Sequence, residues 1–260
     1  MFYLTKKVSI NNCFFKDVWY SGKHDVLVGG GSFMWYPTKR GKELYEKRDI
    51  QYLMNNVAWG DSFAMEAIGV DYLCRINRKT DENIDSSDDD IDIIDGIFLA
   101  IYWFDKSIEA GKIDTNYWIG ETIDFQARIC GSSGAYYRSS FLEHLSKFQE
   151  NPVFKEVMKS KSGCLYKIFR DKTICHFDSK IYYSRAVNVG DSSAAYRLGE
   201  LYLLDWYRDY KNHLAYPSDY VKPCCEDLLE AKKYLEYAAK NGEAEAFNLI
   251  FEVMQGMSDD

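Results

Sequence analysis

The sequence predicts an all-α protein, built as a solenoid of helical hairpins, and three observations carry this prediction. Glycines recur in a fixed phase with aromatic and small residues along the 260-residue chain. The chain contains only 4 prolines, a residue that interrupts helices. Apolar residues make up 47% of the sequence, which is enough to form a buried core. A pattern that repeats along a chain indicates stacked supersecondary units.

The repeat is clearest around Gly190. An aromatic and a small residue precede this glycine by eight and four positions, and small, apolar and glycine residues follow at four, eight and nine: Tyr182, Ala186, Ala194, Leu198 and Gly199. Similar spacing surrounds three other glycines: Gly60, Gly111 and Gly242. Two helical stripes that meet at a hinge have this pattern. Each copy therefore predicts a helical hairpin.

The glycines fall into two classes with different predicted roles. Those at the centre of each copy are expected just past one helix, in a left-handed conformation, with Asp61 and Asp191 capping the next helices. A second class lies nine residues later, inside the following helix: Gly69, Gly120 and Gly199. Glycine there costs about 1 kcal/mol relative to alanine. We expect a neighbouring helix to cross closely at these points, with the aromatic at minus eight filling the groove beside the glycine.

The pattern resembles the Sel-one-like repeat, a relative of the tetratricopeptide repeat with longer loops. Its signature is A-x-x-G-x-x-x-A-x-x-x-L-G-x-x-Y, followed after a loop by A-x-x-x-Y-x-x-A-A-x-x-G. The stretches AVNVGDSSAAYRLGELY at 186–202 and EAKKYLEYAAKNGEAEAFNLI at 230–250 match well, and NVAWGDSFAMEAIGVDY at 56–72 matches nearly as well. The copy at 100–120 is weaker, with Thr115 in place of alanine. The resemblance implies a right-handed solenoid that binds proteins, and it implies no reaction.

The repeat covers only part of the chain. Residues 1–41 are rich in aromatics and predict a small extended N-terminal cap, whereas 42–256 predict the helical repeat domain. Two insertions interrupt that domain, an acidic one at 76–96 and an irregular helical one at 130–175. Within the second insertion, Asn151 and Pro152 predict a helix start. Residues 208–223 are rich in tyrosine and predict a long loop.

Charge and hydropathy narrow the class of partner. The net charge of −8 argues against nucleic acid, because phosphate binding requires a surplus of lysine and arginine. A basic protein is a more suitable partner. The N-terminal stretch has no apolar segment of a signal peptide, and no later stretch approaches the ~20 apolar residues of a membrane span. We therefore expect a cytoplasmic protein with no membrane partner.

Searches for chemical motifs give little. The chain has no HExxH, GxSxG, Walker or dinucleotide-binding motif, and its seven cysteines are too irregularly spaced for a disulfide framework or a CxxC zinc site. Asp88, Asp90 and Asp92 occupy the first three ligand positions of an EF-hand loop, but Ile93 and Leu99 replace the required glycine and glutamate. The sequence therefore predicts a protein that is not an enzyme and holds no metal or cofactor.

Two groups of residues are candidates for a protein-binding surface. The first is a run of acidic residues that would attract a basic partner: Asp85, Asp88, Asp89, Asp90 and Asp92. The second is a set of aromatic and basic residues near the end of a predicted helix: Trp206, Tyr207, Arg208 and Tyr210. A solvated acidic loop and ordinary packing of the aromatics are the alternative interpretations.

These observations favour a non-enzymatic protein-binding scaffold. A compact, acidic repeat protein with unusual insertions is similar to the immunity proteins that neutralise bacterial toxins, and a basic effector toxin is the partner that suits its charge. An adaptor in signalling or envelope processes is an alternative that differs only in its partner. A hydrolase would need a pocket with converging titratable residues, and the sequence offers no such set.

Overall fold

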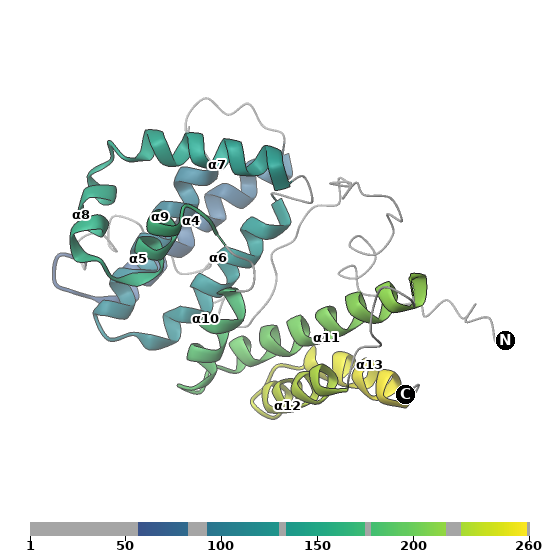
Figure 1. Ribbon diagram of the computed structural model, residues 1–260. Coiled ribbons are helices and arrows are strands. Elements are labelled where there is room, and N and C mark those ends of the chain that lie inside the picture. Colours follow the sequence, from purple (N-terminus) through teal and green to yellow (C-terminus); the bar gives the residue numbers. More distant parts are fainter. Residues whose placement is uncertain (1–56, 83–92, 130–133, 175–177, 217–224, 259–260) are drawn as a thin grey trace.

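The structure, a computed structural model, describes residues 57–82, 93–129, 134–174, 178–216 and 225–258 (Figure 1). Every regular element in these ranges is helical, which confirms the predicted all-α class for this part of the chain. In order, the elements are α4 (Ser62–Glu82), α5 (Ile93–Glu109), the 3-10 helix η1 (Ile113–Thr115), α6 (Asn116–Ile129), α7 (Gly134–Phe148), α8 (Pro152–Ser160), α9 (Gly163–Asp171), α10 (Asp178–Val187), α11 (Ser192–Ala215), α12 (Glu226–Lys240) and α13 (Ala246–Ser258).

The hinge glycines lie in the turns that precede or join helices, as predicted. They have positive φ angles of 78°, 100°, 95° and 104°, in the order Gly60, Gly111, Gly190 and Gly242. Asp61 and Asp191 accept hydrogen bonds from backbone N–H groups at the starts of α4 and α11, at 2.9 Å and 3.0 Å. Both predicted N-caps are therefore confirmed. Three helical hairpins follow from these turns, namely α5–α6, α10–α11 and α12–α13.

The glycines inside helices mark close helix crossings. Gly69 on α4 faces Phe104 on α5, and a Cβ added at Gly69 would overlap the Phe104 ring. A Cβ at Gly120 on α6 would lie 2.6 Å from Tyr183 on α10. Another at Gly199 on α11 would lie 2.6 Å from Leu235 on α12. The same kind of contact therefore joins α4 to α5, α6 to α10 and α11 to α12.

The residue that fills each crossing differs from the prediction by one position. Phe104, Tyr183 and Leu235 stand seven residues before their hinge glycines, whereas the prediction assigned this contact to the aromatic at minus eight. Side chains on a helix lean toward its N-terminus, so a given spot is covered by a residue about one position further along. The minus-eight residue of the last hairpin, Tyr234, instead stacks on Tyr202, with ring centroids 5.9 Å apart.

The insertion between α6 and α10 packs against α5. In Figure 1, α7 and α8 lie on the outside of the group formed by α4, α5 and α6. Phe98 on α5 makes edge contacts with three rings from α7 and α9, at centroid distances of 5.7, 5.1 and 5.3 Å: Phe141, Phe148 and Phe169. Asn151 caps α8 by accepting from the Val153 N–H at 2.9 Å, as predicted. The insertion therefore covers α5 while α6 remains in contact with α10.

Several helix ends differ from the predictions. α4 continues to Glu82, into the range predicted as the acidic insertion at 76–96, and α11 continues to Ala215, through residues predicted as a loop from Arg208. Side-chain contacts about one turn apart stabilise this longer α11. Arg208 forms an ion pair with Asp205 at 2.7 Å, and the Trp206 ring stacks on Tyr210 with centroids 4.9 Å apart. Leu142 on α7 is exposed.

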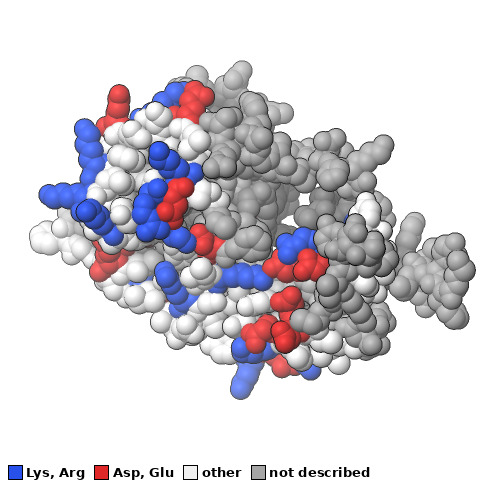
Figure 2. All heavy atoms as spheres, viewed as in Figure 1, with Lys and Arg blue, Asp and Glu red and all other residues white. Residues whose placement is uncertain are grey.

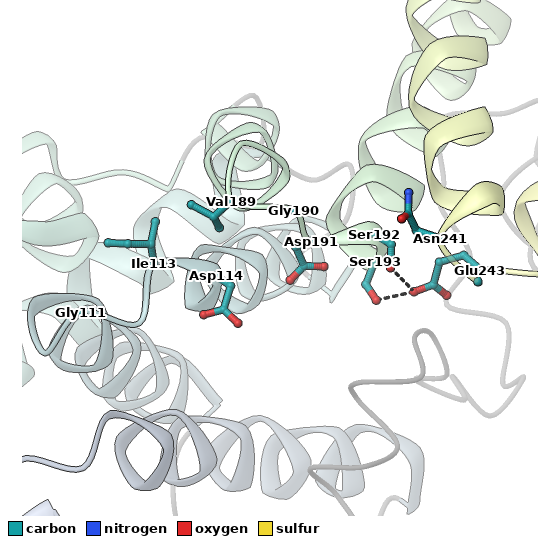
Figure 3. A pocket seen from close by; sticks show the side chains of 11 residues that line it. Gly111, Ile113, Asp114, Val189, Gly190, Asp191, Ser192, Ser193, Asn241 and Glu243 are labelled. Carbon is teal, nitrogen blue, oxygen red and sulfur yellow. Dashed lines mark hydrogen bonds between the residues drawn. The ribbon is translucent and has the colours of Figure 1, made fainter.

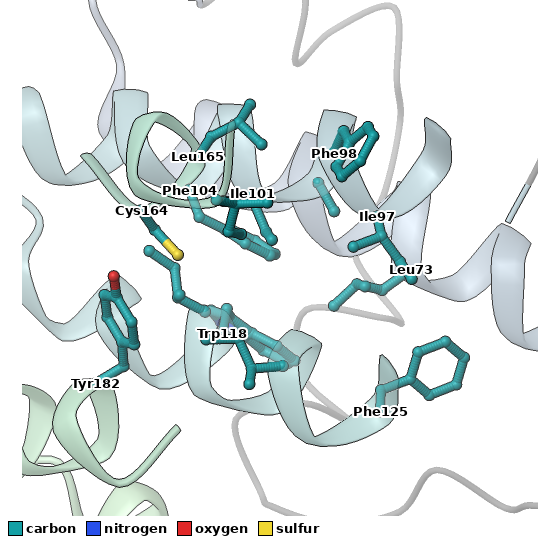
Figure 4. Close-up of a cluster of buried hydrophobic side chains, with 14 of the residues drawn as sticks. Leu73, Ile97, Phe98, Ile101, Phe104, Trp118, Phe125, Cys164, Leu165 and Tyr182 are labelled. Carbon is teal, nitrogen blue, oxygen red and sulfur yellow. The ribbon is translucent and has the colours of Figure 1, made fainter. Parts of the chain in front are cut away.

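The buried apolar residues form two clusters that meet in α11. The larger cluster joins α4 to α11, and Figure 4 shows its centre, where Phe104 and Ile101 lie over Trp118. The smaller cluster joins α11 to α12 and α13 through residues such as Trp206, Leu228 and Val253. No helix among the described residues is long and apolar enough to cross a bilayer.

Candidate functional site

The turns of the three hairpins lie side by side and line a groove of about 670 Å³ (Figure 3). Its residues come from the turn after α5, the turn after α10 and the turn after α12: Gly111, Ile113, Asp114, Val189, Gly190, Asp191, Ser192, Ser193, Asn241, Gly242 and Glu243. The groove therefore brings together parts of the chain that are more than a hundred residues apart in sequence. It exists because the hinge glycines of successive hairpins are neighbours.

The glycines leave the groove open. A Cβ added at Gly111 or Gly242 would meet no atom within 4 Å, so these positions are glycine because of their positive φ rather than because of crowding. Substitution there would strain the turn without closing the groove by direct contact. At Gly111 and Gly242 the space beside the backbone of the turn is therefore unfilled.

Three carboxylates form a row along the groove, from Asp114 through Asp191 to Glu243 (Figure 3). Each has a structural partner. Asp114 pairs with Lys112 at 2.8 Å, Asp191 caps α11, and Glu243 accepts from the Ser193 hydroxyl at 2.5 Å. The lining itself contains these three acidic residues and no basic one, and Glu243 is buried. Positively charged side chains are the ligand groups that it favours.

Apolar side chains accompany the carboxylates. Ile113 and Val189 are exposed within the groove. Trp59 and Phe63, in and just after the turn before α4, are more exposed still. The Lys112 ammonium lies 4.5 Å from the centroid of the Phe63 ring, which places this turn next to the one after α5. The row of turns thus combines apolar contacts with negative charge.

The predicted aromatic surface near the end of α11 is mainly a packing site. Trp206 is only 3% exposed and belongs to the core between α11, α12 and α13, so its role as an exposed anchor is not supported. Tyr207 and Tyr210 are half-buried against the same core. Arg208 is exposed at the surface and pairs with Asp205 and Asp209. None of these four residues lines the groove.

Other predicted features lie outside the described residues. They are the N-terminal cap at 1–41 and the acidic residues Asp85, Asp88, Asp89, Asp90 and Asp92. The acidic attraction of a partner therefore remains a prediction. The helices that flank the acidic residues, α4 and α5, are described and pack against each other.

The negative net charge is unevenly distributed. Basic side chains gather at the end of the molecule formed by α8 and α9 (Figure 2), and the exposed ones there are Lys155, Lys159, Lys161, Arg170 and Lys172. The net charge of −8 gives no indication of this basic end. The groove and the basic end share no residue, so the molecule presents surfaces of opposite charge.

A buried charge network connects the α5–α6 and α10–α11 hairpins. Arg197 on α11 donates from Nε to Glu121 on α6 at 2.7 Å and from Nη1 to Glu200 at 2.8 Å. The Tyr183 hydroxyl lies 2.9 Å from Glu121 and 3.0 Å from Asp124. Burial alone would lower the pKa of Arg197, but Glu121 and Glu200 hold it well above its ordinary value. The network therefore joins α6, α10 and α11, and the groove lining includes none of its residues.

The half-buried carboxylate of Asp105 anchors the insertion. Asp105 on α5 accepts hydrogen bonds at 2.9 Å from the backbone N–H groups of Cys164 and Leu165, which begin α9. Gly163 has a φ of 85°, and any Cβ there would run into the Asp105 carboxylate. Burial raises the pKa of Asp105 from 3.8 to about 7, although the two N–H donors act in the opposite direction.

This pKa predicts a pH-dependent stability. The folded state holds the Asp105 proton up to about pH 7, whereas the unfolded chain releases it near pH 4, so the free energy of unfolding should fall between these values by up to about 4 kcal/mol. Urea denaturation at several pH values checks this. The Asp105→Asn variant should be less stable than the wild type at low pH. Its free energy of unfolding should lack this decrease with rising pH. If the free energy of unfolding depended on pH equally in the wild type and in Asp105→Asn, the assignment of this effect to Asp105 would be contradicted.

No group of three or more histidine, cysteine, aspartate or glutamate residues in the described ranges is arranged to hold a metal ion. Comparison with protein-family models, with curated proteins and with solved structures finds no significant match to this chain. Function must therefore be argued from the groove and its surroundings.

Proposed function

We propose that this chain is a right-handed solenoid of the Sel-one-like type and a non-enzymatic scaffold that binds another protein in the groove across its turns. Three equivalent contacts between successive helices support the solenoid, at Gly69, Gly120 and Gly199. Successive hairpins whose turns share one groove support it as well. Repeat proteins of this kind use extended surfaces built from several units for binding.

The groove's composition is the observation that carries the proposed function. It offers the half-buried carboxylates of Asp114 and Asp191, with Glu243 buried beside them, together with exposed Ile113 and Val189. A partner segment that combines lysine or arginine with apolar side chains satisfies both features. Apolar contacts supply most of the affinity at such a surface, while charge complementarity increases the rate of association and the specificity.

Within this class we propose an immunity protein whose partner is a basic toxin. An overall charge of −8 attracts a basic protein at long range, and the groove then provides short-range contacts. Toxins that act on nucleic acid carry basic active sites, because their substrate is negatively charged. A scaffold that covers such a site prevents the substrate from reaching it, and this inhibition requires no reaction by the scaffold.

A partner-capture experiment with a groove variant tests this proposal. Ile113→Arg combined with Val189→Arg replaces both apolar contacts with like charges for a basic partner. The protein captured from host cells by the wild type is purified, and its dissociation constant is measured by calorimetry against each variant. We expect the double variant to bind about 10- to 100-fold more weakly, the loss typical of removing central apolar contacts. Binding to the wild type should also weaken as salt increases.

The control is Leu214→Arg, which places the same charge on an exposed α11 residue outside the groove lining. It should bind within about 2-fold of the wild type, since rim and remote positions contribute little. Co-expression with the captured protein then asks whether the wild type and the control relieve growth arrest while the groove variant does not. A captured partner that binds the groove variant as tightly as the wild type would refute the assigned surface.

A further inference from the structure

Helix α13 repeats the face of α11 that receives the next hairpin. The hinge glycines Gly190 and Gly242 are 52 residues apart, and the same offset relates three positions on the two helices. On α11 these positions are Ala195, Gly199 and Tyr202. On α13 they are Phe247, Phe251 and Met254.

On α11 this face is covered by α12. Ala195 belongs to the core that α12 shares, a Cβ at Gly199 would lie 2.6 Å from Leu235, and the Tyr202 ring stacks on Tyr234. The equivalent residues of α13 are exposed instead. Phe247 and Phe251 are each 63% exposed, and Met254 is 53% exposed. The face that is an interface on α11 is therefore more than half exposed at these three positions of α13.

Phe251 changes what this face can accept. Glycine at the equivalent position of α4, α6 and α11 leaves room for a side chain from the first helix of the next hairpin. A phenylalanine fills that room and projects outward, so another hairpin cannot pack here by the same contact. The partner must present space or an apolar surface opposite the ring.

The spacing and charge of the stripe favour a second copy of α13. Residues 247, 251 and 254 have the alternating four- and three-residue spacing of a two-helix seam. The exposed side chains of α13 are all uncharged: Phe247, Asn248, Phe251, Met254 and Gln255. Two copies that each carry a charge of −8 repel one another, and the charged residue on α13, Glu252, is half-buried rather than exposed.

We propose that α13 is a self-association site, independent of the groove. Two copies pack antiparallel about a two-fold axis beside Phe251, with Phe247 of one copy against Met254 of the other. A symmetric contact of this kind closes on itself and gives a dimer rather than a filament. A helix of this length spans only about 20 Å, so the interface is small and the dimer dissociates on dilution.

Sedimentation equilibrium of the full chain tests the proposal. The average mass should rise from that of one chain at about 5 µM toward that of two at about 500 µM, the range of a small apolar interface. Phe251→Glu should weaken dimerisation at least 10-fold, because it places two like charges at the two-fold axis. Leu214→Glu is the matched control, since Leu214 is also 63% exposed, and its dimerisation should equal that of the wild type.

A cysteine variant tests the symmetry. Under oxidised glutathione, Phe251→Cys should form a disulfide-linked dimer faster than the wild type or Leu214→Cys, because a residue at a two-fold axis faces its own counterpart. A wild type that stays monomeric at about 500 µM would overturn the proposal. So would dimerisation unchanged by Phe251→Glu, or slow cross-linking of the cysteine variant. Because neither measurement involves a partner protein, these outcomes are separate from failure of the groove.

Discussion

Replacing Arg197 with leucine is expected to lower the free energy of unfolding by about 3–5 kcal/mol. Arg197 is the cation that contacts both Glu121 and Glu200, and all three side chains are buried. Leucine would leave the two glutamates in a site without that positive charge, a cost that its apolar contacts do not offset. The substitution therefore weakens the contact between the α5–α6 and α10–α11 hairpins, because Glu121 belongs to α6 and Arg197 to α11.

Urea denaturation followed by circular dichroism measures this effect. Arg208→Leu is the control on the same helix, because Arg208 makes its ion pairs with Asp205 and Asp209 at the surface. Surface pairs contribute about 0–1 kcal/mol, so the control should change little. If the two substitutions had similar effects, the buried network would not hold the hairpins together.

Replacing Gly199 with alanine is the second change for which we expect a large effect. An added Cβ would lie 2.6 Å from Leu235 and 3.1 Å from the Ala231 carbonyl oxygen. Overpacking of this kind costs about 1–3 kcal/mol, which exceeds the roughly 1 kcal/mol that alanine gains as the better helix former. The variant should therefore be destabilised even though its helix propensity is higher.

A double-mutant cycle separates the crossing from other effects of the substitution. Leu235→Ala alone should cost about 2–5 kcal/mol by leaving a cavity. In the double variant, the new methyl group occupies part of that space, so the combined loss should be smaller than the sum of the single losses by about 1 kcal/mol or more. Additive losses would show that Gly199 and Leu235 do not share one contact.

The sequence was sufficient for features encoded within one hairpin. Hinge glycines, N-caps and the start of α8 depend on neighbours a few residues away, and these predictions agree with the structure at Gly190, Asp191 and Asn151. The close crossings were also predictable, because glycine inside a helix is costly. The identity of the residue that faces each of these glycines was not predictable. The positions eight and seven residues before the hinge glycine both carry large aromatic or apolar side chains, as in Tyr182–Tyr183 and Tyr234–Leu235.

Features that join distant segments left little signal. Arg197 and Glu200, three residues apart on a helix, look like an ordinary surface pair, and Glu121 is 76 residues away. Gly163 follows serine and lysine and resembles a loop residue, although it makes room for Asp105. Trp206 was assigned to a contact surface because its helix was predicted to end nearby, whereas α11 continues and buries it. The groove depends on tertiary proximity of turns and had no signal within any single turn.

The two buried clusters meet in α11, so the molecule has two cooperative units that share this helix. The last hairpin depends on the smaller cluster, while everything before it depends on the larger one. Such units can open separately, because their stabilities are only partly coupled. The groove extends from Asp114 in the first unit to Glu243 in the second. A bound ligand that contacts both ends would therefore stabilise the two units against unfolding together.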